Sequence, residues 1–269
     1  MAYFLTLDVW GSDLRIVQKY LTEHKIIFAV LLITTLLTQI FRFISDTMTK
    51  TGQEAYTRSL EDFMALTGRV VEFKLNRFRK NAKNIKPSGD TFKAITHPRD
   101  QITYIIDQSL VWMREYFVLL ENQLSITIIQ VDDNGSKQYF AFEEPRGWNR
   151  TRAKEIMAAN STASLAAKTG EAQFFADKTK AEKTEEYYKS ERDKTYKQGS
   201  IYCYPILVQV PAGTVGYIIS ITTYGKFLCV PNDTVSEEIT KSIMREICRR
   251  IELELTLLAM KEYRFGEGS

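Results

Sequence analysis

The stretch Gly199–Thr223, GSIYCYPILVQVPAGTVGYIISITT, decides the fold of this chain. Two runs rich in β-branched and aromatic residues lie on either side of Pro211–Ala212–Gly213. Such runs around a proline–glycine break predict an antiparallel hairpin of buried strands. Pro205 lies inside the first run and has no N–H to donate. We therefore expect this strand to be an edge, bulged or interrupted at Pro205.

The totals indicate a globular protein with a sizeable core. A chain of 269 residues suits one large domain or two small ones, and its net charge of +3 is too small to indicate nucleic-acid binding. Cys203, Cys229 and Cys248 lack metal-binding spacing, so we expect reduced core thiols in a cytosolic domain. His24 and His97 stand apart from any cysteine or carboxylate cluster. We predict no catalytic residues, no metal site, no cofactor and no enzyme activity.

The N-terminal part contains a long apolar segment. Residues 1–24 predict an amphipathic helix, and residues 25–45 include Ile26–Phe41, which carries no charge. This run approaches the length that a membrane-spanning helix needs. We expect a single-pass membrane protein with its main domain in the cytoplasm. The alternative is a helix buried in an oligomeric bundle, and the balance of basic residues on the two sides leaves the orientation open.

Residues 46–97 predict a long connecting helix followed by a linker rich in turn residues. The end of this helix carries a basic cluster without acidic neighbours: Lys74, Arg77, Arg79, Lys80, Lys83 and Lys86. Three interpretations compete, namely a solvated helix face, contact with anionic lipid headgroups, and nucleic-acid binding. Nucleic acid is the least favoured, because Phe78 is the lone interleaved aromatic and no binding motif accompanies the charge.

Residues 98–264 alternate helical and extended patterns, which predicts an α+β domain. A strong Asn134–Gly135 turn joins the first two strands, and a Thr234–Glu237 capping box starts the last helix. The segment Asp177–Gln198 is highly charged and predicts a surface loop with helical turns. The remaining expected elements are helices at Pro98–Glu121 and Asn149–Lys168, strands at Leu124–Val131 and Gln138–Phe142, an extended piece at Ala172–Ala176, and a short strand-like piece at Phe227–Val230.

The order of these elements over residues 98–264 resembles the GAF domain family, small-molecule-sensing relatives of the PAS fold. The motifs that carry the resemblance are the Thr169–Gly170–Glu171 turn, the Phe174–Asp177 piece after it, the Cys203–Ile206 piece and the Gly216–Ile221 run. The resemblance implies a central antiparallel sheet with flanking helices on one face and a ligand pocket under a lid on the other. The signatures of cyclic-nucleotide-binding and bilin-attaching members do not occur in this sequence.

The resemblance also implies where a ligand would bind. The corresponding positions end the second strand, follow the Thr169–Gly170–Glu171 turn and lie in the lid and the central hairpin: Phe142, Glu143, Phe175, Ala176, Tyr187, Asp193, Tyr196 and Tyr202. Aromatic rings there could stack on a nucleotide-like ligand, and carboxylates could accept from an exocyclic amine. The competing interpretation makes the two phenylalanines core residues and the two carboxylates solvated charges.

We therefore expect a membrane-tethered, GAF-like sensor of a bacterial signalling type. It would bind a small ligand or a partner and transmit through its flanking helices to the membrane segment as a homo-oligomer. Its output would come from that segment or from a separate protein. The alternative is an adaptor module of the same fold that docks a protein partner without ligand. A third hypothesis is nucleic-acid binding through residues 74–86.

Overall fold

The computed structural model describes residues 21–83, 85, 90–131, 137–143 and 152–265. The chain divides into two compact units, Met1–Glu61 and Asp62–Ser269, and one helix, α3 (Leu21–Ala82), contributes to both. The expected membrane segment is helical and exposes large apolar side chains: Val30, Ile33, Leu36, Leu37, Ile40 and Phe41. Within the described ranges, no helix contains a stretch both long and apolar enough to cross a bilayer. Most of the helix expected at residues 1–24 lies outside those ranges.

The second unit is an α+β fold built on a five-stranded sheet in the order β2-β1-β5-β4-β3. Every pair of neighbouring strands is antiparallel. The strands are β1 (Leu124–Val131), β2 (Lys137–Glu143), β3 (Gln173–Phe175), β4 (Ile201–Val210) and β5 (Gly213–Thr223). The hairpin expected from Gly199–Thr223 is therefore confirmed as β4 and β5, with β5 in the middle of the sheet.

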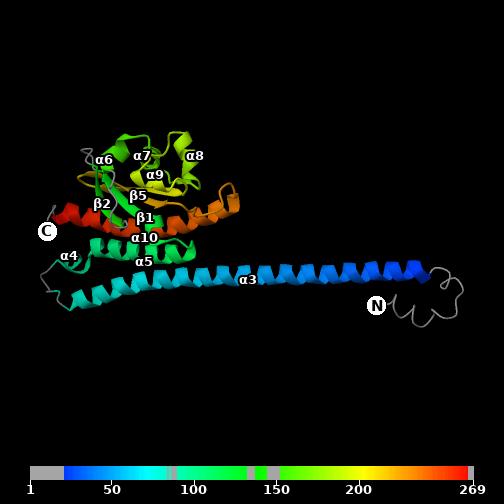
Figure 1. Cartoon of the computed structure of the whole chain (residues 1–269). Coiled ribbons are helices and arrows are strands. Elements are labelled where there is room, and N and C mark those ends of the chain that lie inside the picture. The colour runs from blue at the N-terminus through cyan, green and yellow to red at the C-terminus, as the bar shows by residue number, and fades with distance from the viewer. Residues whose placement is uncertain (1–20, 84, 86–89, 132–136, 144–151, 266–269) are drawn as a thin grey trace. The chain divides into compact units, whose positions relative to one another are not determined.

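Both faces of the central strands are buried. Alternate residues of a strand point to opposite faces, and consecutive residues of these strands lie in two different cores. On one face, Tyr202 and Ile219 belong to the larger core with α5 (Pro98–Tyr116) and α10 (Thr234–Phe265). On the other, Cys203 belongs to a smaller core with α6 (Ala153–Ala158) and α7 (Thr162–Thr169). Figure 1 shows the sheet between these two layers. The remaining short helices are α4 (Thr91–Ile95), η1 (Glu121–Gln123), α8 (Lys178–Lys183) and α9 (Glu191–Thr195).

The part of α3 within the second unit adds another helix to the layer of α5 and α10. Leu66 and Val70 are buried in the larger core. The ring of Phe73 stacks on that of Tyr104 of α5, with centroids 4.0 Å apart and planes 8° from parallel. The backbone carbonyl of Val70 accepts a hydrogen bond from Gln101 Nε2 at 2.9 Å. Apolar burial, ring stacking and a buried polar contact thus fix α3 against α5.

At Pro205, β4 forms an edge of the sheet. It pairs with Ile218 of β5 on one side. On the other side, β3 is paired only with Ile201–Cys203. Among the described strands, none therefore needs an N–H from residue 205, which confirms the edge expected there.

The prediction of one continuous helix at Asn149–Lys168 is wrong, because the structure has two helices there, α6 and α7. The chain leaves the helical conformation at Ala159 and re-enters it after Ser161. Ser161 Oγ accepts from Ser164 N at 3.1 Å, and Ser164 Oγ accepts from Ser161 N at 3.0 Å. This reciprocal serine cap starts a new helix where the apolar pattern alone indicated a continuous one.

The start of α10 also differs from expectation. Asp233, rather than Thr234, supplies the cap, since its Oδ1 accepts from Val235 N at 3.1 Å. Glu237 Oε1 accepts from Asn232 N at 3.1 Å, so the reciprocal bond reaches two residues further back than a Thr234–Glu237 box would. The strand-like piece expected at Phe227–Val230 is not a strand.

Two glycine substitutions should move stability in opposite directions. Gly199 has a φ of 148°, and a Cβ there would lie 2.1 Å from the carbonyl oxygen of Thr223. We expect Gly199→Ala to lower the free energy of unfolding by more than about 2 kcal/mol. Gly68 lies in exposed helix with no atom within 4 Å of a Cβ, so Gly68→Ala should raise it by about 1 kcal/mol. Urea unfolding measures both, and a fully stable Gly199→Ala protein would contradict the packing described here.

Candidate functional site

The segment between β3 and β4 carries the short helices α8 and α9, and side chains cap both. Asp177 Oδ1 accepts from Thr179 N at 2.9 Å at the start of α8. Asp193 Oδ2 accepts from Ser190 N at 2.8 Å and from Ser190 Oγ at 2.6 Å at the start of α9. The expected helical turns are therefore present. The expectation of a surface loop is wrong for three of its charged residues, which are only 1–4% exposed: Lys178, Arg192 and Asp193.

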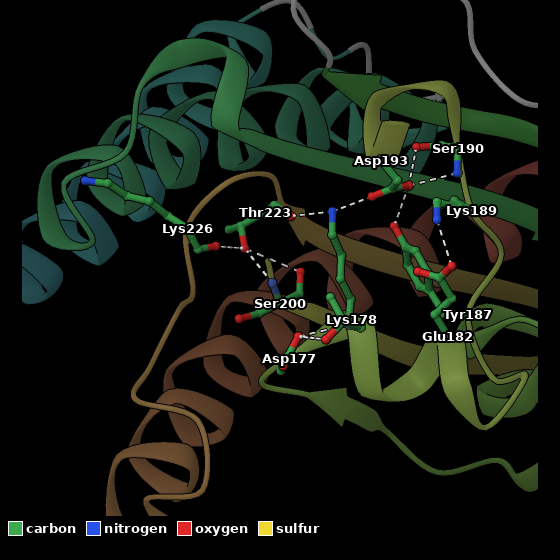
Figure 2. A network of polar contacts seen from close by, with 11 residues as sticks. Asp177, Lys178, Glu182, Tyr187, Lys189, Ser190, Asp193, Ser200, Thr223 and Lys226 are labelled. Carbon is green, nitrogen blue, oxygen red and sulfur yellow. Dashed lines mark hydrogen bonds and ion pairs between the residues drawn. The ribbon is translucent and has the colours of Figure 1, made fainter. Parts of the chain in front are cut away.

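Two of these buried charges, Lys178 and Asp193, belong to one network of polar contacts (Figure 2). The Lys178 ammonium makes an ion pair with Asp193 Oδ1 and donates to the carbonyl oxygen of Thr223 at 3.2 Å. The other carboxylate oxygen of Asp193 accepts from the Tyr187 hydroxyl at 2.9 Å. Burial lowers the pKa of Lys178, and the negative charge of Asp193 opposes that shift. The two contacts of Lys178 are buried, and they join α8 to α9 and to the end of β5.

The ring of Tyr224 completes the surroundings of the ammonium. Lys178 Nζ lies 4.3 Å from the centroid of this ring, and the Arg192 guanidinium carbon lies 5.1 Å from it. A cation over an aromatic face is attracted by the ring quadrupole, most strongly where water is excluded. Two cations therefore lie against Tyr224, while Asp193 supplies the carboxylate of the network.

The structure brings some of the expected ligand-binding residues together. Phe175 and Tyr187 pack against the smaller core, on the sheet face covered by α6 and α7. Asp193 lies next to Tyr187 through their 2.9 Å hydrogen bond. Ala176 is buried, and its carbonyl oxygen accepts from Ser200 Oγ at 2.6 Å. This group around α8 and β3 is the candidate site, and Asp193 there is not the solvated charge of the competing interpretation.

The other expected residues lie elsewhere. Tyr202 is 1% exposed and points to the opposite face of the sheet, into the larger core, so it does not face the candidate site. The hydroxyl of Tyr196 accepts from Asn122 Nδ2 at 2.8 Å, just before β1. Phe142 and Glu143 lie on β2, paired with β1, and three strands separate β2 from β3 in the sheet order. The fold therefore does not bring all eight residues together in one contiguous site.

The cysteines are free thiols, as expected. Cys203 lies in the smaller core with Ser220 Oγ 3.3 Å from its sulfur, and burial raises its pKa to about 12. Burial also raises the pKa of Cys229 to about 11. Thiols with such pKa values are almost entirely protonated near neutral pH, which makes them poor nucleophiles. In the part of the chain that the structure describes, no group of three or more His, Cys, Asp or Glu is placed to hold a metal ion.

The basic cluster of residues 74–86 is partly neutralised. Lys74 makes an ion pair with the buried carboxylate of Glu254, and Arg77 makes one with Asp100 at 3.2 Å. The side chains of Arg79, Lys80 and Lys83 are exposed, whereas Lys86 lies outside the described residues. The cluster is therefore in part an internal contact between α3, α5 and α10, which weakens the argument for nucleic acid.

A groove of about 270 Å³ lies among α3, α5 and α10 within the second unit. Its walls are mostly apolar, with the Lys74–Glu254 pair among its polar members. Val71 of α3 and Leu253 of α10 line the groove and are exposed, and each has a second exposed apolar residue on the same helix, Met64 on α3 and Met260 on α10. The lining consists of Val70, Val71, Lys74, Leu75, Phe78, Gln101, Ile105, Arg250, Leu253 and Glu254.

The sequence interpretation missed two key charges. Glu254 had a visible signal, since it lies on the apolar face of the last helix between Ile251 and Leu258. Lys178 had none, because the lid contains many lysines and carboxylates without periodicity. Only the fold selects which of them is buried.

Comparison with known proteins finds similarity among solved structures. No protein-family model matches the chain, and no curated protein matches it. Among solved structures, the chain is similar to the GAF domain of a two-component sensor histidine kinase from Bacillus halodurans. The two are 14% identical with a TM-score of 0.34, and the match covers 59% of this chain and 95% of that one.

Proposed function

We propose that Asp62–Ser269 is a GAF-like sensing domain that binds a small ligand or a partner on the sheet face covered by α6, α7 and α8. The role is one of binding rather than catalysis. The observation that supports it most is the separation of the two cores: the larger one holds the sheet to α5 and α10, and the smaller one holds the short helices. The short helices can therefore rearrange while the larger core stays intact.

The side chains on this face suit a flat, partly apolar ligand. Phe175 and Tyr187 offer aromatic surface beside Met157 and Ile156. Polar groups converge there as well, since Asp193 and the Tyr187 hydroxyl belong to the adjoining network. A few convergent polar groups beside aromatic surface are typical of small-molecule sites. A nucleotide-like ligand fits this chemistry, and its binding would displace α6–α8 from the sheet.

A thermal-shift screen with purine and pyrimidine nucleotides tests this proposal. A ligand that binds the folded state should stabilise it by about 2.7 kcal/mol at about 100 times its Kd. Met157→Ala, in the smaller core, should change the ligand-induced shift. Met244→Ala, in the larger core, should lower the melting temperature and leave that shift unchanged. If no ligand produces a shift, the adaptor hypothesis is favoured over the sensor.

A second role, association of two copies, is supported by the groove among α3, α5 and α10. Met64 and Val71 are seven residues apart on α3, as are Leu253 and Met260 on α10, so each pair lies on one helix face. These side chains are 50–65% exposed beside the groove. A symmetric pair of copies would bury the same patch twice. We infer that the sensor is a homo-oligomer that uses this surface and signals through α3 and α10.

Charge introduced on this surface should break the association. Val71→Glu and Leu253→Glu in the full chain should weaken self-association at least tenfold, because each would bury an unpaired carboxylate at the contact. Val111→Glu is the matched control, since Val111 is 48% exposed on α5 and does not line the groove. Analytical ultracentrifugation gives the dissociation constants. Equal values for Val71→Glu and Val111→Glu would exclude the groove as the contact.

We also propose that the first unit contacts a membrane and that the domain lies on the cytoplasmic side. The support is the row of exposed apolar side chains on α3, among them Leu37 at 61% and Phe41 at 76%. Thr34 Oγ1 and Thr38 Oγ1 donate to the carbonyl oxygens of Val30 and Thr34 at 2.7 Å, which satisfies these hydroxyls within the helix. Such internal pairing lowers the cost of moving a hydroxyl into lipid.

Vesicle flotation of the full chain checks this contact. Leu37→Asp should reduce the fraction that floats with neutral phospholipid vesicles severalfold, because moving an unpaired carboxylate from water into lipid is costly. Leu120→Asp is the control, since Leu120 is 65% exposed in the second unit. Flotation that is the same for both variants would rule out contact through this segment.

A further inference from the structure

The ammonium of Lys178 occupies an unusual position for a lysine, since the residue is 1% exposed. Its surroundings are a carboxylate, a carbonyl oxygen and an aromatic face, from Asp193, Thr223 and Tyr224. A second ring, that of Tyr187, has its centroid 5.8 Å from the ammonium. This combination is the chemistry by which proteins recognise a primary ammonium group. The chain itself supplies the ammonium that fills the site.

Asp193 does not need Lys178 to be hydrogen-bonded. Its Oδ2 atom accepts from Ser190 N, Ser190 Oγ and the Tyr187 hydroxyl at 2.6–2.9 Å. Three donors therefore hold this carboxylate and cap α9 whether or not the ammonium is present. What Lys178 adds is a connection, because its backbone belongs to α8 while its ammonium contacts α9 and the end of β5.

We propose that Lys178 is a built-in ligand: its ammonium fills an ammonium-binding cage of Asp193, Thr223 and Tyr224, and this contact latches the α8–α9 segment onto the sheet. The α8–α9 segment can open only if this contact breaks. Breaking it exposes a cage that accepts a primary ammonium group. This inference goes beyond the proposed function and holds whether or not a ligand binds under the short helices.

A second ion pair in the same segment provides a control for the test of the latch. The same segment contains a second ion pair, between Lys189 and Glu182 at 2.7 Å, whose side chains are 47% and 44% exposed. Exposed pairs of this kind contribute little, whereas removal of one partner from a buried pair leaves an uncompensated charge. Lys189 is therefore a matched control for Lys178 within the same segment.

Hydrogen–deuterium exchange of the full chain tests the latch. Lys178→Met keeps the unbranched shape and most of the length of the side chain and removes the charge. We expect exchange in residues 178–195 to rise at least tenfold, while β1 and β5 keep their protection. Lys189→Met should change exchange in the same residues less than about twofold. If Lys178→Met exchanges like the wild type, the latch is excluded; if the sheet loses protection together with the segment, Lys178 is a core residue and the latch is equally excluded.

Chemical rescue tests the cage. Lys178→Ala removes a propylammonium group, so n-propylammonium chloride should restore protection of residues 178–195 in this variant. Sodium chloride at equal ionic strength and 1-propanol at equal concentration should not restore it. Rescue by 1-propanol to the same extent would show that filling space suffices and would overturn the ammonium cage. Absence of any rescue, with Lys178→Ala folded by circular dichroism, would overturn it as well.

Discussion

The fold depends on one constraint, that Gly216–Thr223 of β5 and Ile201–Cys203 of β4 are buried on both faces. A strand buried on one face alternates apolar and polar residues, whereas these strands carry apolar residues at both odd and even positions. Helices must then cover both sides of the sheet. The long helices α5 and α10 cover one side with the larger core, and the short helices α6 and α7 cover the other with the smaller core. The two faces of the sheet therefore differ, with long helices on one and short helices on the other.

Much of this architecture could be predicted because local patterns determine it. The strands at Leu124–Val131 and Gly199–Thr223, and the helix beginning at Pro98, follow from runs of apolar residues and from proline and glycine positions. The errors occurred where side chains compete with the backbone. Ser161 caps a new helix inside an apolar pattern, and Asp233 rather than Thr234 starts the last one. Short polar side chains decide such boundaries within a few residues, and periodicity does not detect them.

The candidate site was less predictable than the fold. Phe175, Tyr187 and Asp193 do meet near α8, since they lie close along the chain. Tyr202 was assigned to the site although it faces the larger core, because one strand presents alternate residues to opposite faces and the pattern alone does not say which face a ligand would use. The burial of Lys178 depends on contacts with Asp193 and Thr223, which lie 15 and 45 residues away in sequence. No local rule reaches that far.

The edge at Pro205 has a consequence for solubility. An exposed strand edge offers unpaired N–H and C=O groups to any other chain, and it can seed aggregation by adding strands. Beyond Cys203, β4 carries the exposed Leu207, which would favour such addition. Proline at position 205 removes one donor from the edge and bars a continuous ladder. Pro205 therefore also protects the folded protein against aggregation by strand addition.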